Sequence, residues 1–139
     1  MRNEKSLVKS KTKISFLKLL IASTSEEGIL AIDGLYLGFV SEGTINSYFE
    51  KADDSQLHSN STGFSYMTQL TDKKKIELNN LFDQEPDIIH EIIHFIIIDK
   101  GLKAFESYDN FSVNNSYGSL LSQINIQPFI EEGMKINTE

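Results

Sequence analysis

The chain has 139 residues, of which 40% are hydrophobic and 24% charged, a composition that fits one compact globular domain and excludes a disordered or fibrous protein. It contains no cysteine, which excludes disulfides and thiol nucleophiles and leaves only His, Asp and Glu as ligands for a metal ion. Its formal charge is −7, which argues against nucleic acid as a partner because phosphate binding needs clustered cations. No apolar run reaches the roughly 20 residues that a membrane span needs.

The distribution of basic residues indicates the domain organisation. Residues 1–13 are rich in lysine and arginine and are expected to form a flexible basic leader, and residues 14–139 a single domain. Apolar positions from Ile14 to Ala22 favour a buried first helix, with a strand as the weaker alternative. The compartment is not decided by the sequence: the cytoplasm is slightly favoured, and secretion is compatible with the absence of cysteine.

Short strands and one short helix are expected in the next part of the chain. Strands are predicted at four segments: residues 29–32, 35–40, 63–67 and 75–79. The first two flank Asp33-Gly34, a dipeptide typical of tight hairpin turns, and are therefore expected to pair with each other. A short helix is expected over residues 44–51, and a polar loop that carries His58 over residues 53–62.

Residues 86–101 decide how the function is interpreted. The segment begins with Pro and Asp, which are typical of a helix start, and ends with Gly101, which is typical of a helix stop. Against a helix, it contains seven β-branched isoleucines, which suit a buried strand equally well. In a strand, His90 and His94 would share one face. A helix is the prediction, and a strand is the alternative.

His90-Glu91-Ile92-Ile93-His94 is an H-E-x-x-H motif. On a helix, residues four apart project from the same face, so the two imidazoles can bind one zinc ion. Glu91 would then act as the general base that takes a proton from the zinc-bound water. The alternative is a buried apolar element whose two histidines fall four apart by chance. A catalytic zinc also requires a third protein ligand.

A second motif, Pro128-Phe129-Ile130-Glu131-Glu132-Gly133, follows a few dozen residues later. Together, the two motifs resemble the gluzincin metallopeptidases, whose H-E-x-x-H helix is followed by a second helix that carries a glutamate ligand directly before a glycine. The resemblance implies that His90, His94 and Glu132 bind Zn2+ and that Glu91 is the catalytic base. Glu131 is the rival of Glu132 as third ligand. Taken alone, the two glutamates also fit a solvated pair at a helix start.

The resemblance further implies an α+β fold of the small zincin-like kind, with a short twisted sheet. An edge strand, at residues 63–67, would lie above the active-site helix and bind a peptide or protein substrate, and a second C-terminal helix would carry the ligand. Some gluzincins have an Asp four residues after the ligand glutamate, where this chain has Ile136. Candidates for that supporting role are Glu106, Asp109 and Glu139. Tyr108 and Tyr117 are candidates to bind the oxyanion.

The charge suggests a second class of function. An acidic body is typical of a non-enzymatic binding protein, such as an immunity protein or antitoxin that neutralises a basic nuclease partner. In that case His90 and His94 would be core histidines on a strand. On the sequence alone, zinc-dependent peptide-bond hydrolysis is the preferred hypothesis because its two motifs are more specific than an acidic composition.

Overall fold

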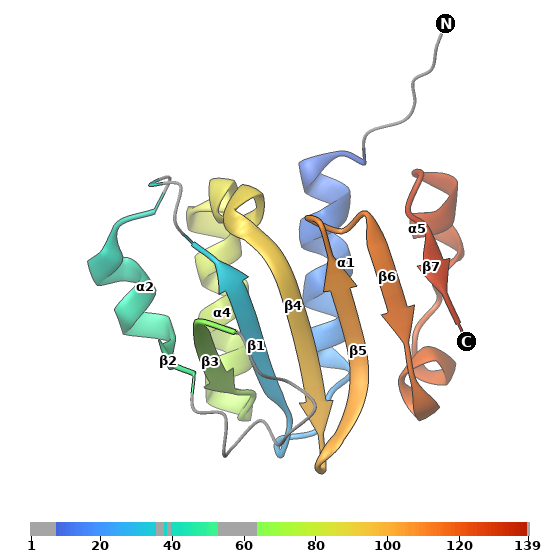
Figure 1. The fold of residues 1–139 in the computed structure, drawn as a ribbon, viewed down its shortest axis with the longest axis horizontal. Helices are drawn as coiled ribbons and strands as arrows, with labels where there is room; N and C mark the ends of the chain where they lie inside the picture. The colour runs from blue at the N-terminus through green and yellow to red at the C-terminus, as the bar shows by residue number, and fades with distance from the viewer. Residues whose placement is uncertain (1–7, 36–37, 39, 53–63, 139) are drawn as a thin grey trace, which may run out of the picture.

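The computed structural model describes residues 8–35, 38, 40–52 and 64–138. The chain has an α+β fold, as predicted, in which helices pack on a seven-stranded sheet (Figure 1). The helices are α1 (Ser10–Ala22), α2 (Glu42–Tyr48), α4 (Asp72–Gln84) and α5 (Gln127–Glu131), with 3-10 helices η1 (Pro86–Glu91) and η2 (Gly118–Gln123). The strands are β1 (Ile29–Gly34), β2 (Glu50–Lys51), β3 (Tyr66–Gln69), β4 (Ile92–Asp99), β5 (Leu102–Tyr108), β6 (Val113–Ser116) and β7 (Ile136–Asn137). Among these helices none is long and apolar enough to cross a membrane.

The sheet has the strand order β2-β3-β1-β4-β5-β6-β7, so β4 lies at its centre. All neighbouring strands are antiparallel except β6 and β7, which are parallel. Ile96 of β4 lies opposite Ala31 of β1 on one side and Glu106 of β5 on the other. Because facing residues of paired strands share one face of the sheet, this register determines which side chains meet.

Helices α1 and α4 cover one face of the sheet, and the main core lies between the two layers (Figure 1). There, Phe16 of α1 packs edge-on against Phe105 of β5, with ring centroids 5.4 Å apart. A smaller buried cluster on the opposite face contains Ala31, Met67, Ile96 and Ile98. Over β4, β5 and β6 this opposite face carries no helix in the described part of the chain (Figure 1). It is called the open face below.

The predicted helix over residues 86–101 is wrong. The segment forms the short 3-10 helix η1 and then the central strand β4, which was the alternative. Four consecutive residues of β4, from Phe95 to Ile98, are buried, and they alternate between the main core and the smaller cluster. A strand that is buried on both faces takes a continuous apolar run, and β-branched isoleucines pack well on its pleated surface.

The predicted strand at residues 75–79 is also wrong, because this segment lies inside helix α4. Thr71 caps the helix by accepting a hydrogen bond from the backbone N–H of Lys74, at 3.2 Å. The buried residues of α4 are Leu78, Leu81 and Phe82, whose spacing of three and four is that of one helix face. Ile76, which lies two residues before the buried Leu78, is 65% exposed, so the two do not share a buried face as they would in a strand.

The Asp33-Gly34 turn is not formed, although the strand predicted at residues 29–32 is confirmed. Both residues continue β1, which pairs with the distant strands β3 and β4. The register shifts between them, as at a β-bulge, and Gly34 has a φ of +130°. No strand is formed by the described residues of the segment 35–40, of which residues 36, 37 and 39 lie outside the described residues.

The other predicted elements are present in the structure, but several of their boundaries differ. Helices are confirmed as α1, α2 and α5, and the strand expected at 63–67 forms nearby as β3. It is not the predicted edge strand, because β3 pairs with β2 on one side and β1 on the other. Helix α1 begins at Ser10, so residues 10–13 belong to it and not to a flexible leader. The helix expected over 44–51 ends at Tyr48. The polar loop with His58 lies outside the described residues.

Gly34 is required by a close approach of two chain segments. A Cβ atom at this position would lie 2.0 Å from the carbonyl oxygen of Glu91. We therefore expect Gly34→Ala to destabilise the protein by about 2–4 kcal/mol, since the backbone must move and the positive φ adds strain. Gly43→Ala is the matched control, because position 43 lies in α2 and a Cβ there would meet only the Ser41 hydroxyl, at 4.0 Å. Urea unfolding of both variants measures the difference, and equal stabilities would contradict this packing.

Candidate functional site

The residues predicted to bind zinc do not come together. His90 is an exposed residue of η1, and its Nε2 lies 3.3 Å from Oγ of Ser10 in α1. Glu132 is exposed directly after α5, and its Oε1 accepts a hydrogen bond of 3.5 Å from Thr12, also in α1. Both contacts are with the helix layer. His94, in contrast, lies on β4 with the orientation of Ile96, on the open face.

Glu91, the predicted catalytic base, has no exposed surface. Its Oε2 accepts a hydrogen bond of 2.9 Å from the backbone N–H of Val40, and its carbonyl oxygen accepts one of 2.8 Å from Leu35. The residue therefore joins the chain after β1 to the junction of η1 and β4. In this position its carboxylate is not accessible to a substrate.

The described residues contain no group of three or more His, Asp or Glu that could hold a metal ion. His90, His94, Glu131 and Glu132 all lie within the described residues, so the ligand set implied by the gluzincin resemblance does not fit this geometry. Without the helix, the two histidines lack the spacing on one helix face that made them candidates. Of the expected supporting residues, Glu139 lies outside the described residues.

The open face carries a hydrogen-bonded network centred on Glu106, which is only 7% exposed. The hydroxyls of Tyr108 and Tyr117 donate to its two carboxylate oxygens, at 2.7 and 2.5 Å. The Asn115 amide donates at 3.4 Å, and the Lys103 ammonium lies 3.6 Å away. Each carboxylate oxygen of Glu106 thus has two donors near it. The tyrosine hydroxyls donate to Glu106, so they are not positioned to bind the oxyanion of a substrate.

The network keeps Glu106 ionised and both phenols protonated. Burial opposes the charge of Glu106, but the hydrogen bonds from Tyr117, Tyr108 and Asn115, together with Lys103, outweigh it and lower the pKa of the carboxyl group. Burial, the hydrogen bond to Glu106 and its negative charge raise the pKa of Tyr108 and of Tyr117 to about 12. Neither phenol is therefore a proton donor to substrate near neutral pH.

An aromatic patch surrounds this network on the open face. His94 accepts a hydrogen bond on Nδ1 from the backbone N–H of Asp109, at 3.1 Å, and its ring lies 5.3 Å from that of Tyr108. Val113 of β6 faces Tyr108 in the register and is 45% exposed. The open-face patch is defined as His94, Tyr108, Val113 and Tyr117.

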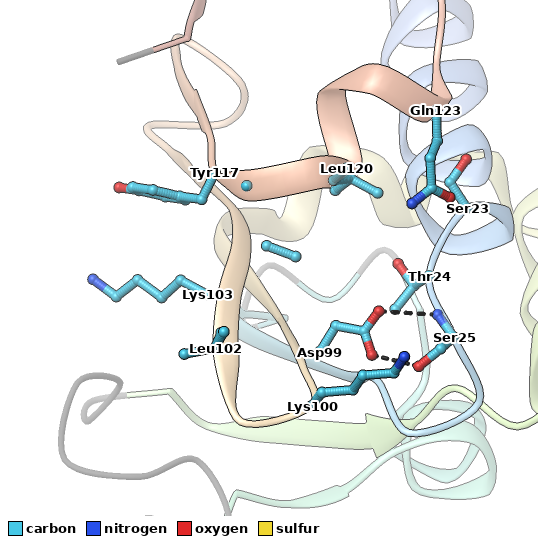
Figure 2. Close-up of a pocket in the computed structure, with 12 residues that line it drawn as sticks. Ser23, Thr24, Ser25, Asp99, Lys100, Leu102, Lys103, Tyr117, Leu120 and Gln123 are labelled. Carbon is cyan, nitrogen blue, oxygen red and sulfur yellow. Dashed lines mark hydrogen bonds between the residues drawn. The ribbon is translucent and has the colours of Figure 1, made fainter.

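A pocket of about 380 Å³ lies at the end of the β4–β5 hairpin, between the exit of α1 and η2 (Figure 2). Its polar lining includes Ser23, Asp99, Lys100 and Gln123. Ala104 and Leu120 contribute apolar surface. In Figure 2 the Lys100 and Gln123 side chains approach the pocket from opposite sides. This pocket is separate from the Glu106 carboxylate, although Lys103 and Tyr117 border both.

Comparisons with known proteins add no family to this description. A scan against protein-family models, a search of curated proteins and a search of solved structures found no match. The open-face patch and the pocket must therefore be interpreted from their own chemistry.

The sequence suggests separate roles for Tyr108, Tyr117 and Glu106 but does not show that they form one network. The available signal was the spacing of Glu106 and Tyr108, two residues apart, which places both on one face of a strand. Tyr117 could not be added without knowing that β5 pairs with β6 through Phe105 and Ser116.

Replacing Glu106 tests the network. In Glu106→Gln one side-chain oxygen becomes an NH2 group, which cannot accept a hydrogen bond from a tyrosine, so we expect a loss of roughly 1–3 kcal/mol at pH 7. The folded state lowers the pKa of Glu106 below its usual 4.5, so its contribution is present above that pH and is lost as pH falls through the folded pKa. The stability difference should therefore shrink between about pH 5 and pH 3.

Urea unfolding at several pH values measures this dependence. Glu132→Gln is the matched control, because Glu132 is exposed and its replacement should change stability by less than about 0.5 kcal/mol at any pH. A Glu106→Gln variant that is as stable as the parent chain at pH 7 would contradict a stabilising role of the network.

Proposed function

We propose that the chain is a non-enzymatic, acidic protein-binding module that uses its open face to bind a basic protein. The observation that carries this proposal is the open-face patch, in which one buried carboxylate fixes two tyrosines on a sheet face that no helix of the described residues covers. A half-exposed aliphatic side chain, Val113, faces Tyr108 in the register. Aromatic residues beside apolar ones at the centre of a polar rim are typical of protein interfaces.

The hydrogen bonds to Glu106 prepare the tyrosines for binding. Each phenol is already oriented by its bond to the carboxylate, so little side-chain entropy remains to be lost when a partner packs on the rings. Tyrosine also offers a large contact area with few rotatable bonds. A rigid aromatic surface of this kind suits recognition better than catalysis, because both oxygens of Glu106 are already occupied by donors.

The charges around the patch favour a basic partner. Asp33 of β1 faces His94 in the register, and the exposed Asp109 follows Tyr108. With Glu106 they make three carboxylates in this part of the sheet, and among the described residues the Lys103 ammonium pairs with one of them, Glu106. The chain as a whole carries a charge of −7. Such a field accelerates association with a positively charged protein and weakens with added salt. An immunity protein that covers a basic nuclease is one protein of this class.

Zinc-dependent peptide-bond hydrolysis, by the gluzincin-type mechanism with Glu91 as base, stays a prediction from the two sequence motifs. The described geometry gives it no support, because Glu91 is buried and the three predicted ligands contact different parts of the fold. The binding proposal instead uses the residues that the structure brings together.

A substitution in the patch tests the proposal. In Val113→Arg, a positive charge enters the patch opposite Tyr108, and we expect the chain to lose its basic partner through both repulsion and lost apolar contact. Ile76→Arg is the matched control, because Ile76 is 65% exposed on α4, in the layer that covers the other face. Both variants and the parent chain are immobilised, and the proteins that they retain from an extract of the source cells are quantified by mass spectrometry.

The parent chain and Ile76→Arg should retain the same basic protein at low salt, and Val113→Arg should not. Raising the salt from about 50 to 300 mM should release that protein, because screening shortens the range of the attraction. Retention that is unchanged by Val113→Arg, or that involves only acidic proteins, would contradict the proposed interface.

A further inference from the structure

The pocket in Figure 2 brings together three polar side chains from three separate segments. Ser23 follows α1, Lys100 lies in the β4–β5 turn and Gln123 ends η2. Their hydroxyl, ammonium and amide groups have no hydrogen-bond or ion-pair partner within the described part of the chain. Three such groups around one cavity are available to a ligand, because none must break an internal bond to bind it.

The walls of this pocket are held in place by their own hydrogen bonds. Ser25 donates through its backbone N–H to Asp99, at 3.1 Å, and also through its hydroxyl (Figure 2). These bonds fasten the chain after α1 to the end of β4. The Thr24 hydroxyl donates to the carbonyl oxygen of Leu20 at 2.7 Å, which fixes the last turn of α1. The cavity is therefore formed before any ligand arrives, which lowers the entropic cost of binding.

Among the residues that the structure describes, the pocket offers one unpaired ammonium, that of Lys100, to a ligand with one negative charge. Its lining contains one acid, Asp99, and two lysines, Lys100 and Lys103. The Asp99 carboxylate accepts two hydrogen bonds from Ser25, and Lys103 lies 3.6 Å from Glu106. The ammonium of Lys100 is left as the charge with no partner in the described residues. The Lys100 ammonium can therefore pair with a carboxylate of a ligand, while Asp99 keeps its own negative charge in the same lining.

The remaining lining residues indicate which neutral groups the ligand would carry. Ser23 and Gln123 can donate and accept hydrogen bonds, as hydroxyl groups require. Ala104 and Leu120 offer apolar contact for a short carbon chain. The volume, about 380 Å³, is within the range of pockets for small molecules. The geometry points to a binding site for a small hydroxylated carboxylate, with its carboxylate at Lys100 and its hydroxyls at Ser23 and Gln123.

A titration monitored by 15N NMR tests this site, with gluconate as the probe. The comparison probes are sorbitol, which has the hydroxyls without the charge, and acetate, which has the charge without the hydroxyls. Gluconate should shift the amide signals of Ser23, Lys100 and Gln123 and bind at least about fivefold more tightly than either comparison probe, as expected for one lost charge or hydrogen-bond contact of about 1 kcal/mol.

The informative variant is Lys100→Asn, which removes the ammonium without disturbing the turn. Lys100 and Gly101 have φ values of +55° and +80°, and Asn-Gly is a favoured pair in a two-residue hairpin turn with positive φ at both positions. Lys73→Gln, at an exposed position of α4, removes one charge elsewhere. We expect Lys100→Asn to weaken gluconate binding at least about fivefold and Lys73→Gln to leave it unchanged.

Two results would overturn the assignment. The first is that the amide signals around the pocket do not move with gluconate at concentrations up to about 50 mM, where even weak sites are occupied. The second is that they move equally with sorbitol or acetate, or equally in Lys100→Asn. Neither result bears on the open-face patch, so failure of this site is distinguishable from failure of the proposed protein-binding function.

Discussion

The position of β4 at the centre of the sheet is the constraint on which the rest of the structure depends. Its backbone pairs with β1 on one side and β5 on the other, and four of its five isoleucines are buried, some on each face. Pairing on two sides satisfies the backbone donors and acceptors of a segment that has almost no contact with water. The helices α1 and α4 then cover one face, and the side chains of the other face are left to form the open-face patch.

The central position of β4 also separates the residues that the two sequence motifs predicted to form a metal site. A helix would place His90 and His94 one turn apart on one face. In the structure, the chain changes from η1 to β4 between them, so His90 contacts α1 and His94 packs against Tyr108 on the opposite side of the sheet. Glu91 lies at this change of direction, where its buried carboxylate and carbonyl hold the chain that follows β1. This packing role explains why the Glu91 carboxylate is inaccessible to a substrate.

The first helix, α2 and the last helix could be predicted from the sequence because each has local signals, whereas the α+β class was implied by the gluzincin resemblance. The prediction was wrong where local signals conflicted with distant pairing. Pro, Asp and Gly at the ends of residues 86–101 are helix signals, but the β-branched interior gains more from two neighbouring strands that only the folded chain supplies. At residues 75–79 five residues were too few to distinguish alternation from the helical spacing of Leu78, Leu81 and Phe82. The Glu106 network could not be assembled from the sequence, since it joins β5 to Tyr117 through strand pairing.

The central claim is that residues 92–99 form a strand that is paired on both sides, and it can be measured directly by NMR in solution, with and without zinc. The account predicts extended Cα and Cβ chemical shifts over this segment and NOEs from Ile96 to Ala31 and to Glu106, which face it in the register, all unchanged by one equivalent of zinc. Helical shifts over residues 88–98, or a zinc-dependent change in which the His90 and His94 side chains bind one ion, would contradict it.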